Sequence, residues 1–220
     1  EMYTYSFVSR QDISCAGLDP ESDALSLANP LTSEMTHMRP WLGISILKAV
    51  ADNQKSRDEL NLFELSSEYH PRTGTPPLTP PRRGGERIFP PLPEGRLGGV
   101  GVPELPEERQ KLIVVYAGRE DREGAHFYSV KGVAEHLAQV LGIPAFGYEK
   151  VASTGGAPWV KHYHPSRVLL CKSGRDILGV VGELHPALLK AYGIEHRVAF
   201  LEWEMKALLP LIGRGRAYEP

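Results

Sequence analysis

The 220-residue sequence has few of the features that mark secreted or membrane proteins. Its two cysteines, Cys15 and Cys171, are too few for a disulfide framework and form no CxxC pair. No apolar run reaches the length of a membrane span, and residues 1–5 show no signal-peptide pattern. The formal net charge of −2 excludes a strong overall attraction to nucleic acid or anionic lipid, so such a contact would require a local patch. These absences predict a cytoplasmic protein without membrane contact.

Motifs of phosphate-binding loops, catalytic serines and zinc proteases are missing as well. No GxGxxG, GxxxxGK[ST], GxSxG or HExxH pattern occurs. His162, His164 and His185, together with Cys171, could ligate zinc, but their spacing is unlike that of a Cys/His zinc site. We therefore expect no catalytic, cofactor-binding or metal-binding residue in this chain.

Two basic segments could each meet a phosphate. Lys131-Gly132 lies where we expect a helix to begin, and Gly213-Arg214-Gly215-Arg216 follows the last expected strand. No other phosphate-binding feature accompanies either segment. We interpret Gly132 as a residue that permits close packing of the helix on a sheet, and the glycine-arginine segment as a linker.

What the sequence does contain is a long segment, 71–106, that is crowded with proline and glycine. No regular element is expected there, and such a stretch is typical of a functional loop, a disordered insert or a linker. We favour an insert, because the sequence after it again has the pattern of sheet strands. This predicts a single domain, 1–220, interrupted by an insert at 71–106. The strand-like start of the chain also suggests a piece of a longer protein.

Hydrophobic periodicity outside this segment predicts strands and helices in no regular alternation. Strands are expected at 2–8, 25–27, 62–69, 112–117, 146–151, 167–172, 177–184 and 198–205. Helices are expected after Ser9, from Pro40 onward, before Gly142 and after His185. This order predicts an α+β fold with a mostly antiparallel sheet that carries its helices on one face.

Several short motifs follow one another in a particular order. They are Thr4-Tyr5-Ser6-Phe7, Asn29-Pro30-Leu31-Thr32, Arg39 to Leu42, Leu62-Phe63-Glu64-Leu65, Glu108-Arg109, Phe127 to Gly132, His164-Pro165 and Gly179 to Pro186. Their order resembles the synthetase-like region of bacterial phenylalanyl-tRNA synthetase beta chains over nearly the whole sequence. The resemblance implies a class II aminoacyl-tRNA synthetase-like fold.

The resemblance also implies a module without chemistry of its own. Catalytic class II domains carry a phosphate-binding arginine on the strand that matches residues 62–69, whereas the charged residues here are Glu64 and Glu68, which would repel ATP. The implied role is to scaffold the catalytic alpha chain, which attaches phenylalanine to tRNA with ATP and Mg²⁺. The expected partners are thus the alpha chain and, indirectly, tRNA.

Two sets of residues are candidate contact sites. The resemblance implies a subunit interface, with a plain core role as the alternative, for Arg39, Trp41, Leu42 and Ile46. A local cationic patch for RNA, with a solvated loop as the alternative, is formed in the insert by Arg82, Arg83, Arg87 and Arg96.

Two other functions remain open from the sequence. A stand-alone paralogue could bind a small molecule or RNA in a degenerate synthetase cleft. An independent ligase would show phenylalanine-dependent ATP–pyrophosphate exchange by the chain alone.

Overall fold

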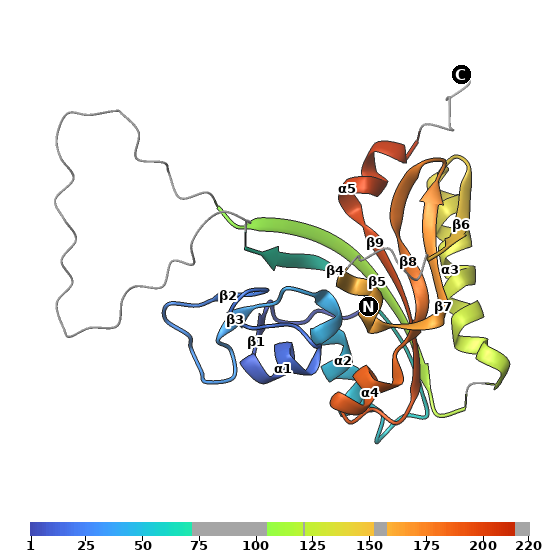
Figure 1. Cartoon of the computed structure of the whole chain (residues 1–220). Helices are drawn as coiled ribbons and strands as arrows, with labels where there is room; N and C mark the ends of the chain where they lie inside the picture. The colour runs from blue at the N-terminus through green and yellow to red at the C-terminus, as the bar shows by residue number, and fades with distance from the viewer. Residues whose placement is uncertain (72–104, 121, 152–157, 214–220) are drawn as a thin grey trace, which may run out of the picture.

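The computed structural model describes residues 1–71, 105–120, 122–151 and 158–213, and its centre is a twisted antiparallel sheet (Figure 1). Six strands of this central sheet follow the order β4-β5-β9-β8-β7-β6, and three short strands form a second sheet in the order β1-β3-β2. Every strand pairing in the described residues is antiparallel. The predicted α+β class with a mostly antiparallel sheet is confirmed.

The elements have the following bounds. The strands are β1 (Phe7–Val8), β2 (Leu25–Ser26), β3 (His37–Met38), β4 (Glu59–His70), β5 (Glu107–Gly118), β6 (Phe146–Lys150), β7 (Tyr163–Ser173), β8 (Asp176–Leu184) and β9 (Arg197–Glu204). The α-helices are α1 (Arg10–Cys15), α2 (Leu42–Asn53), α3 (Ala125–Leu141), α4 (Pro186–Ala191) and α5 (Met205–Leu208). The 3₁₀ helices are η1 (Arg122–Gly124), η2 (Pro158–His162) and η3 (Leu209–Leu211). No helix among the described residues is long and apolar enough to cross a membrane.

Helices cover both faces of the central sheet, so the expectation that one face carries them is wrong. Helices α1, α2 and α4 pack with Phe200 on one face, and α3 and α5 pack with Leu201 and Trp203 on the other (Figure 1). The reason lies in β9, where six consecutive residues are buried. A strand that is apolar on both sides needs a layer on both sides.

The predicted insert lies between two strands that pair with each other. β4 and β5 pair along their whole lengths, from Glu59 opposite Gly118 to His70 opposite Glu107. Residues 72–104, and with them most of the segment 71–106, lie outside the described residues. The insert and the single-domain organisation therefore stay predictions.

The first helix forms as expected, but the first strand is shorter than predicted. The Ser9 hydroxyl accepts a hydrogen bond from the Asp12 N–H, and Asp12 accepts one from the Ser9 N–H, which is a capping box. Of the predicted strand 2–8, only Phe7–Val8 is β1. The Met2 N–H instead donates to the Phe63 carbonyl at 2.9 Å, so this end of the chain follows the edge of β4.

Helix α2 begins at Leu42, two residues later than the first-turn position predicted for Pro40. Trp41 is the N-cap residue and makes no side-chain cap. The cap comes from β4, because the Leu42 N–H donates to Glu68 Oε1 at 2.9 Å. A cap from a distant strand leaves no local sequence signal, which is why the start was misplaced.

Helix α3 ends at Gly142 as predicted, but Lys131-Gly132 does not lie at its start. The helix begins at Ala125, so both residues lie beyond its first turn and cannot offer N–H groups of a helix terminus. Lys131 Nζ bonds Glu135 Oε1 at 2.6 Å and lies 4.6 Å from the centre of the Tyr148 ring. A Cβ atom at Gly132 would meet nothing within 4 Å, so the interpretation of Gly132 as a close-packing residue is also wrong.

This open position gives a first prediction. Gly132→Ala should raise the free energy of unfolding by about 0.5–1 kcal/mol, because alanine loses less backbone entropy in a helix and fits here without a clash. Gly142→Ala is the matched control at the C-cap of the same helix, where the φ of +67° favours glycine, and it should destabilise instead. Urea unfolding of both variants measures the two signs; destabilisation by Gly132→Ala would contradict the argument.

Candidate functional site

The face of the central sheet that lies under α2 carries polar and charged side chains at its centre. Cross-strand register places Glu64, Ile113 and Glu202 side by side on β4, β5 and β9. Glu64, Glu68 and Glu202 are at most 4% exposed, and we call these three residues the carboxylate cluster. Buried carboxylates require partners, and those partners determine what this face can do.

Glu64 is held by Arg39, whose side chain is fully buried. Arg39 Nη1 lies 3.4 Å from Glu64 Oε1, and the Thr4 hydroxyl bonds both carboxylate oxygens at 3.0 and 2.8 Å. The remaining donors of Arg39 reach the Ser66 hydroxyl and the Ser67 carbonyl. Burial lowers the pKa of the Arg39 guanidinium, and the Glu64 charge opposes this, so the pair is satisfied internally.

Glu68 is committed to the start of α2. Its Oε1 accepts the Leu42 N–H, and its Oε2 lies 3.9 Å from Lys111 Nζ and 3.5 Å from His70 Nε2. A carboxylate beside the first N–H groups of a helix is stabilised by the helix dipole. Glu68 therefore fixes α2 on β4 and is not an open ligand for a metal or a substrate.

Glu202 is enclosed by aromatic side chains. Its Oε2 accepts the Trp41 indole N–H at 3.1 Å, and its Oε1 accepts the Tyr163 hydroxyl. Burial raises the pKa of Glu202, an effect that Lys111 opposes and the charge of Glu68 reinforces. The Trp41 indole, Tyr163 and Glu202 together fill the middle of this sheet face.

Trp41 itself is fixed from two sides. Its ring stacks on His162 with a centroid distance of 4.1 Å and an interplanar angle of 10°. On the other side lies Gly43, where a Cβ atom would come within 2.2 Å of the indole. The indole thus occupies a slot that only a glycine at this position leaves open.

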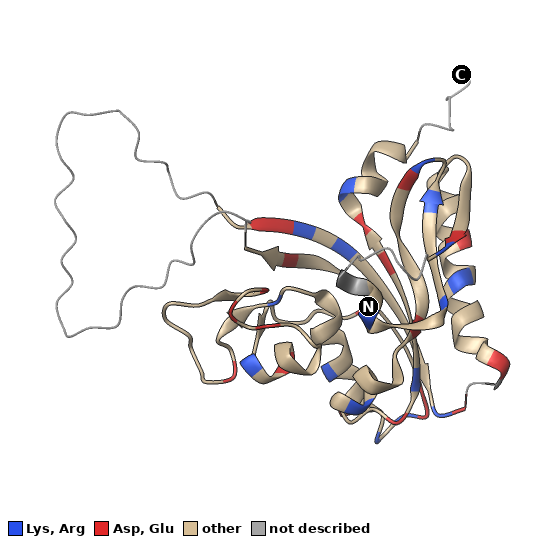
Figure 2. Cartoon of the chain, viewed as in Figure 1, with Lys and Arg blue, Asp and Glu red and all other residues tan. Residues whose placement is uncertain are grey.

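This arrangement offers no phosphate site on β4. Within β4, Glu59–His70, there is no arginine or lysine. The carboxylate oxygens of Glu64 and Glu68 already contact Arg39, Thr4 and the Leu42 N–H at the start of α2. Figure 2 marks lysine and arginine positions along the neighbouring strand β5. On this strand, Lys111 Nζ lies 3.9 Å from Glu68 Oε2 and 3.9 Å from Glu204 Oε2. The charged groups on this sheet face therefore form a buried network in which the carboxylates are paired with groups of the same chain.

The four residues predicted to form a subunit interface are brought together, but inside the chain. Arg39, Leu42 and Ile46 are fully buried and Trp41 is 5% exposed. The three apolar residues belong to the same hydrophobic core. The alternative of a core role accounts for each of them in this chain, and the subunit contact stays a prediction. The RNA-contact candidates lie outside the described residues; they are Arg82, Arg83, Arg87 and Arg96.

The zinc candidates have separate structural roles. His162 Nε2 bonds the Ala16 carbonyl, His164 Nδ1 accepts from Ser166, and His185 caps α4. Cys171 is buried in the core on the α3 side of the sheet, where burial raises its pKa to about 12. Across the described residues, no three His, Cys, Asp or Glu side chains come together as a metal-binding group.

The sequence did not reveal three residues of this network, namely Thr4, Tyr163 and Glu202. Each is separated from its partner by at least 35 positions. Threonine, tyrosine and glutamate are also common residue types, so none of the three is conspicuous in the sequence. One signal was available for Glu202, because a carboxylate stands inside the apolar run 198–203 of an expected central strand.

His162 predicts how stability depends on pH. Burial lowers the pKa of His162 from 6.5 to about 4, so the folded chain keeps it neutral while the unfolded chain binds a proton. Stability should therefore fall as pH decreases from about 6.5 to about 4, by up to about 3 kcal/mol from this group. His162→Gln should remove that part of the slope in urea unfolding at several pH values.

Glu202 also contributes to the pH dependence of stability, and a second variant measures its contribution separately. Because the pKa of Glu202 is raised, its contribution has the opposite sign and stability is lost as pH rises through its pKa. Glu202→Gln should remove only the Glu202 contribution. An unchanged pH profile in His162→Gln would contradict the assignment to His162.

Comparison with known proteins gives one family. Residues 1–205 match the model of the phenylalanyl-tRNA synthetase beta chain CLM domain. The chain is 31% identical over 217 residues to the phenylalanine–tRNA ligase beta subunit of Ruegeria pomeroyi, and 26% identical over 221 residues to that of Fusobacterium nucleatum. Both alignments cover 96% of this chain and 23% of the relative, so the chain spans about a quarter of the length of these curated relatives.

Solved structures give the fold. A pyrrolysyl-tRNA synthetase from Desulfitobacterium hafniense superposes with a TM-score of 0.63 at 14% identity, and the superposition covers 99% of this chain and 67% of that one. A second structure of the enzyme from that organism gives a TM-score of 0.61 at 13% identity, with coverage of 94% and 60%. The class II synthetase-like fold expected from the sequence is confirmed.

Proposed function

Because this chain belongs to the family of phenylalanyl-tRNA synthetase beta chains, we propose that it is the noncatalytic synthetase-like module that supports the catalytic alpha chain. In this proposal the alpha chain uses ATP and Mg²⁺ to attach phenylalanine to tRNA in the cytoplasm. The module contributes a folded surface for assembly, and tRNA is only an indirect partner.

The observation that carries the noncatalytic role is the state of the carboxylate cluster. A class II active site needs cationic groups aimed at ATP phosphates and acidic groups free to bind Mg²⁺. Here Glu64 is paired with Arg39, Glu68 caps α2 and Glu202 is enclosed by Trp41 and Tyr163. The groups that could do chemistry hold the fold together instead.

The proposal is tested by assembly with the alpha chain. The chain and the catalytic alpha chain, mixed or coexpressed, should elute as one complex in size-exclusion chromatography with light scattering. Phenylalanine-dependent ATP–pyrophosphate exchange should appear only in samples that contain the alpha chain. Separate elution would contradict the assembly role, and exchange by this chain alone would establish the independent ligase.

The stand-alone binding function is less well supported. It requires an open cleft over the central sheet, whereas Trp41, Tyr163 and His162 fill that face and are at most 5% exposed. Calorimetry of the chain alone with phenylalanine and with ATP should therefore show no binding at this face. A Glu202→Gln-sensitive heat signal would favour the paralogue instead.

A further inference from the structure

The side of the central sheet that α3 and α5 cover continues beyond these two helices. Cross-strand register places Trp203, Leu112 and Leu65 in one row across β9, β5 and β4. Trp203 is fully buried, Leu112 is partly buried and Leu65 is 54% exposed. Figure 1 shows the β4–β5 hairpin reaching away from α3 and α5. The apolar face of the sheet therefore runs from a covered core into solvent.

The start of the chain, which follows the edge of β4, extends this face. The Thr4 hydroxyl bonds Glu64, so the Thr4 side chain lies on the α2 side of the sheet. Because side chains alternate along an extended chain, Tyr3 and Tyr5 lie on the opposite side, where they are 83% and 74% exposed. Phe63 is on the same side of β4 and is 42% exposed. We call the exposed side chains on this side the edge patch; they are Tyr3, Tyr5, Phe63 and Leu65.

The size of the edge patch is that of a contact site. Its side chains expose on the order of 500 Å², given that a fully buried aromatic side chain covers about 150–250 Å². The largest apolar patch of a typical monomer is about 300–600 Å² and is often functional. Each partner of a standard interface contributes about 800 Å². The edge patch with its rim is therefore large enough for a weak dimer.

The nearest polar neighbours of the edge patch on β4 and β5 are uncharged. On the same face of the sheet they are Asn61, Ser67, Gln110 and Tyr116. Glu1 lies at the rim, where its Oε1 accepts the Tyr3 hydroxyl at 2.6 Å. Two identical surfaces bind each other only if they bring no like charges together, and an apolar patch between uncharged neighbours meets this condition.

We propose that the edge patch binds a second copy of this chain, with the same face of both copies packed together around a twofold axis. In this dimer Tyr3 and Tyr5 of each copy cover Phe63 and Leu65 of the other. The second copy supplies the layer that α3 and α5 supply to the rest of the face. The proposal goes beyond the proposed function, because this contact forms without the alpha chain.

Sedimentation velocity of the intact chain, from low micromolar to several hundred micromolar, tests the proposal. We expect a monomer that converts to a dimer with a dissociation constant in the micromolar range. Tyr3→Glu and Leu65→Glu should each weaken the dimer at least about 30-fold, because each places two like charges in an apolar contact. Tyr3 is 83% exposed and lies outside the helices and strands, so its variant tests the contact even if Leu65→Glu is unstable.

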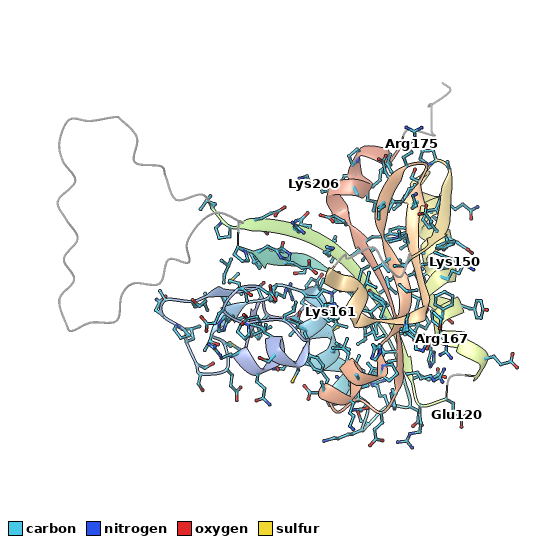
Figure 3. The ribbon with its side chains drawn as sticks, in the orientation of Figure 1. Glu120, Lys150, Lys161, Arg167, Arg175 and Lys206 are labelled. Atoms are coloured by element: carbon cyan, nitrogen blue, oxygen red, sulfur yellow. The ribbon has the colours of Figure 1, made fainter. Side chains whose placement is uncertain are left out.

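The matched controls place the same charge at similarly exposed positions elsewhere. Ile177 is 53% exposed on β8, as Leu65 is on β4, and Tyr128 is 66% exposed on α3. Figure 3 places Arg175, a near neighbour of Ile177 in sequence, at the tip of the β7–β8 hairpin, away from β4 and β5. Ile177→Glu and Tyr128→Glu should change the dissociation constant less than about 2-fold.

Three outcomes would overturn the proposal. The first is a monomer at every concentration, and the second is a dimer that Tyr3→Glu and Leu65→Glu weaken no more than Ile177→Glu does. The third is that both patch variants weaken only the complex with the alpha chain, which would make the edge patch a contact for that partner. Because the homodimer is measured without the alpha chain, its absence leaves the proposed assembly with that chain to be decided by its own experiment.

Discussion

Replacing Arg39 with alanine is expected to lower the free energy of unfolding of this chain by about 3–5 kcal/mol, which is the usual cost of breaking a buried ion pair by removing one partner. Arg39 is fully buried and Glu64 is only 1% exposed, so water cannot replace the guanidinium. The variant also removes donors from Thr4 and from Ser66. Chemical denaturation monitored by far-UV circular dichroism measures the loss.

Two further variants identify the cause of this loss. Arg10 pairs with Glu21 on the surface, where the side chains are 60% and 69% exposed, and Arg10→Ala should cost less than about 1 kcal/mol. Adding Glu64→Gln to Arg39→Ala should restore part of the stability, because it removes the unpaired buried charge. If Arg39→Ala costs no more than Arg10→Ala, the buried pair does not hold this face together.

The fold was predictable wherever local patterning decides the structure. The helical spacing up to Leu141 with a glycine at 142, and the apolar runs of β5, β8 and β9, each give one element at nearly the observed position. The layer arrangement was not predictable in the same way. Periodicity showed that β9 is apolar, but the burial of β9 on both faces depends on α3 and α2 arriving from distant parts of the chain.

The site was predictable in composition but not in geometry. The absence of arginine and lysine from residues 62–69 could be read directly, and the longer strand that forms, Glu59–His70, contains neither residue type. The partners of Glu64 and Glu68 could not be read, because both are contributed across long sequence separations by the segment around Arg39 and Leu42. The same long-range contacts explain why a motif chosen as a subunit contact lies in the core of this chain.

Glu183, whose buried Oε1 has no hydrogen-bond partner among the described residues, is a second example of a contact that the sequence does not predict. In sequence, Glu183 stands in the motif that runs from Gly179 to Pro186 and contributes only to the resemblance. In the structure it lies among Arg167, Arg197 and the start of α3, which come from three separate elements. The pocket that Glu183 lines has no sequence signature, since its lining comes from α3, β6, β7, β8 and β9, which are separate segments of the chain.

Replacing Trp41 with alanine should have an effect as large as that of Arg39→Ala, about 3–5 kcal/mol, because it removes the largest ring on this sheet face and leaves a cavity. The His162 ring loses its stacking partner, and Glu202 Oε2 loses the indole N–H. Trp41→Phe keeps an aromatic ring but removes the N–H, so it should cost about 1–3 kcal/mol for the unsatisfied Glu202 oxygen. Urea unfolding of the isolated chain gives both values.

These two Trp41 variants also decide between the core role and the subunit contact. A core residue lowers the stability of the isolated chain when it is truncated, and any loss of alpha-chain binding then follows from unfolding. A subunit contact leaves the stability of the isolated chain unchanged and weakens only the complex. Since Trp41 is 5% exposed and its N–H is bound to Glu202 within the same chain, we expect the first outcome. Unchanged unfolding of Trp41→Ala together with loss of the complex would move Trp41 to the interface, and the start of α2 would then have to open when the alpha chain binds.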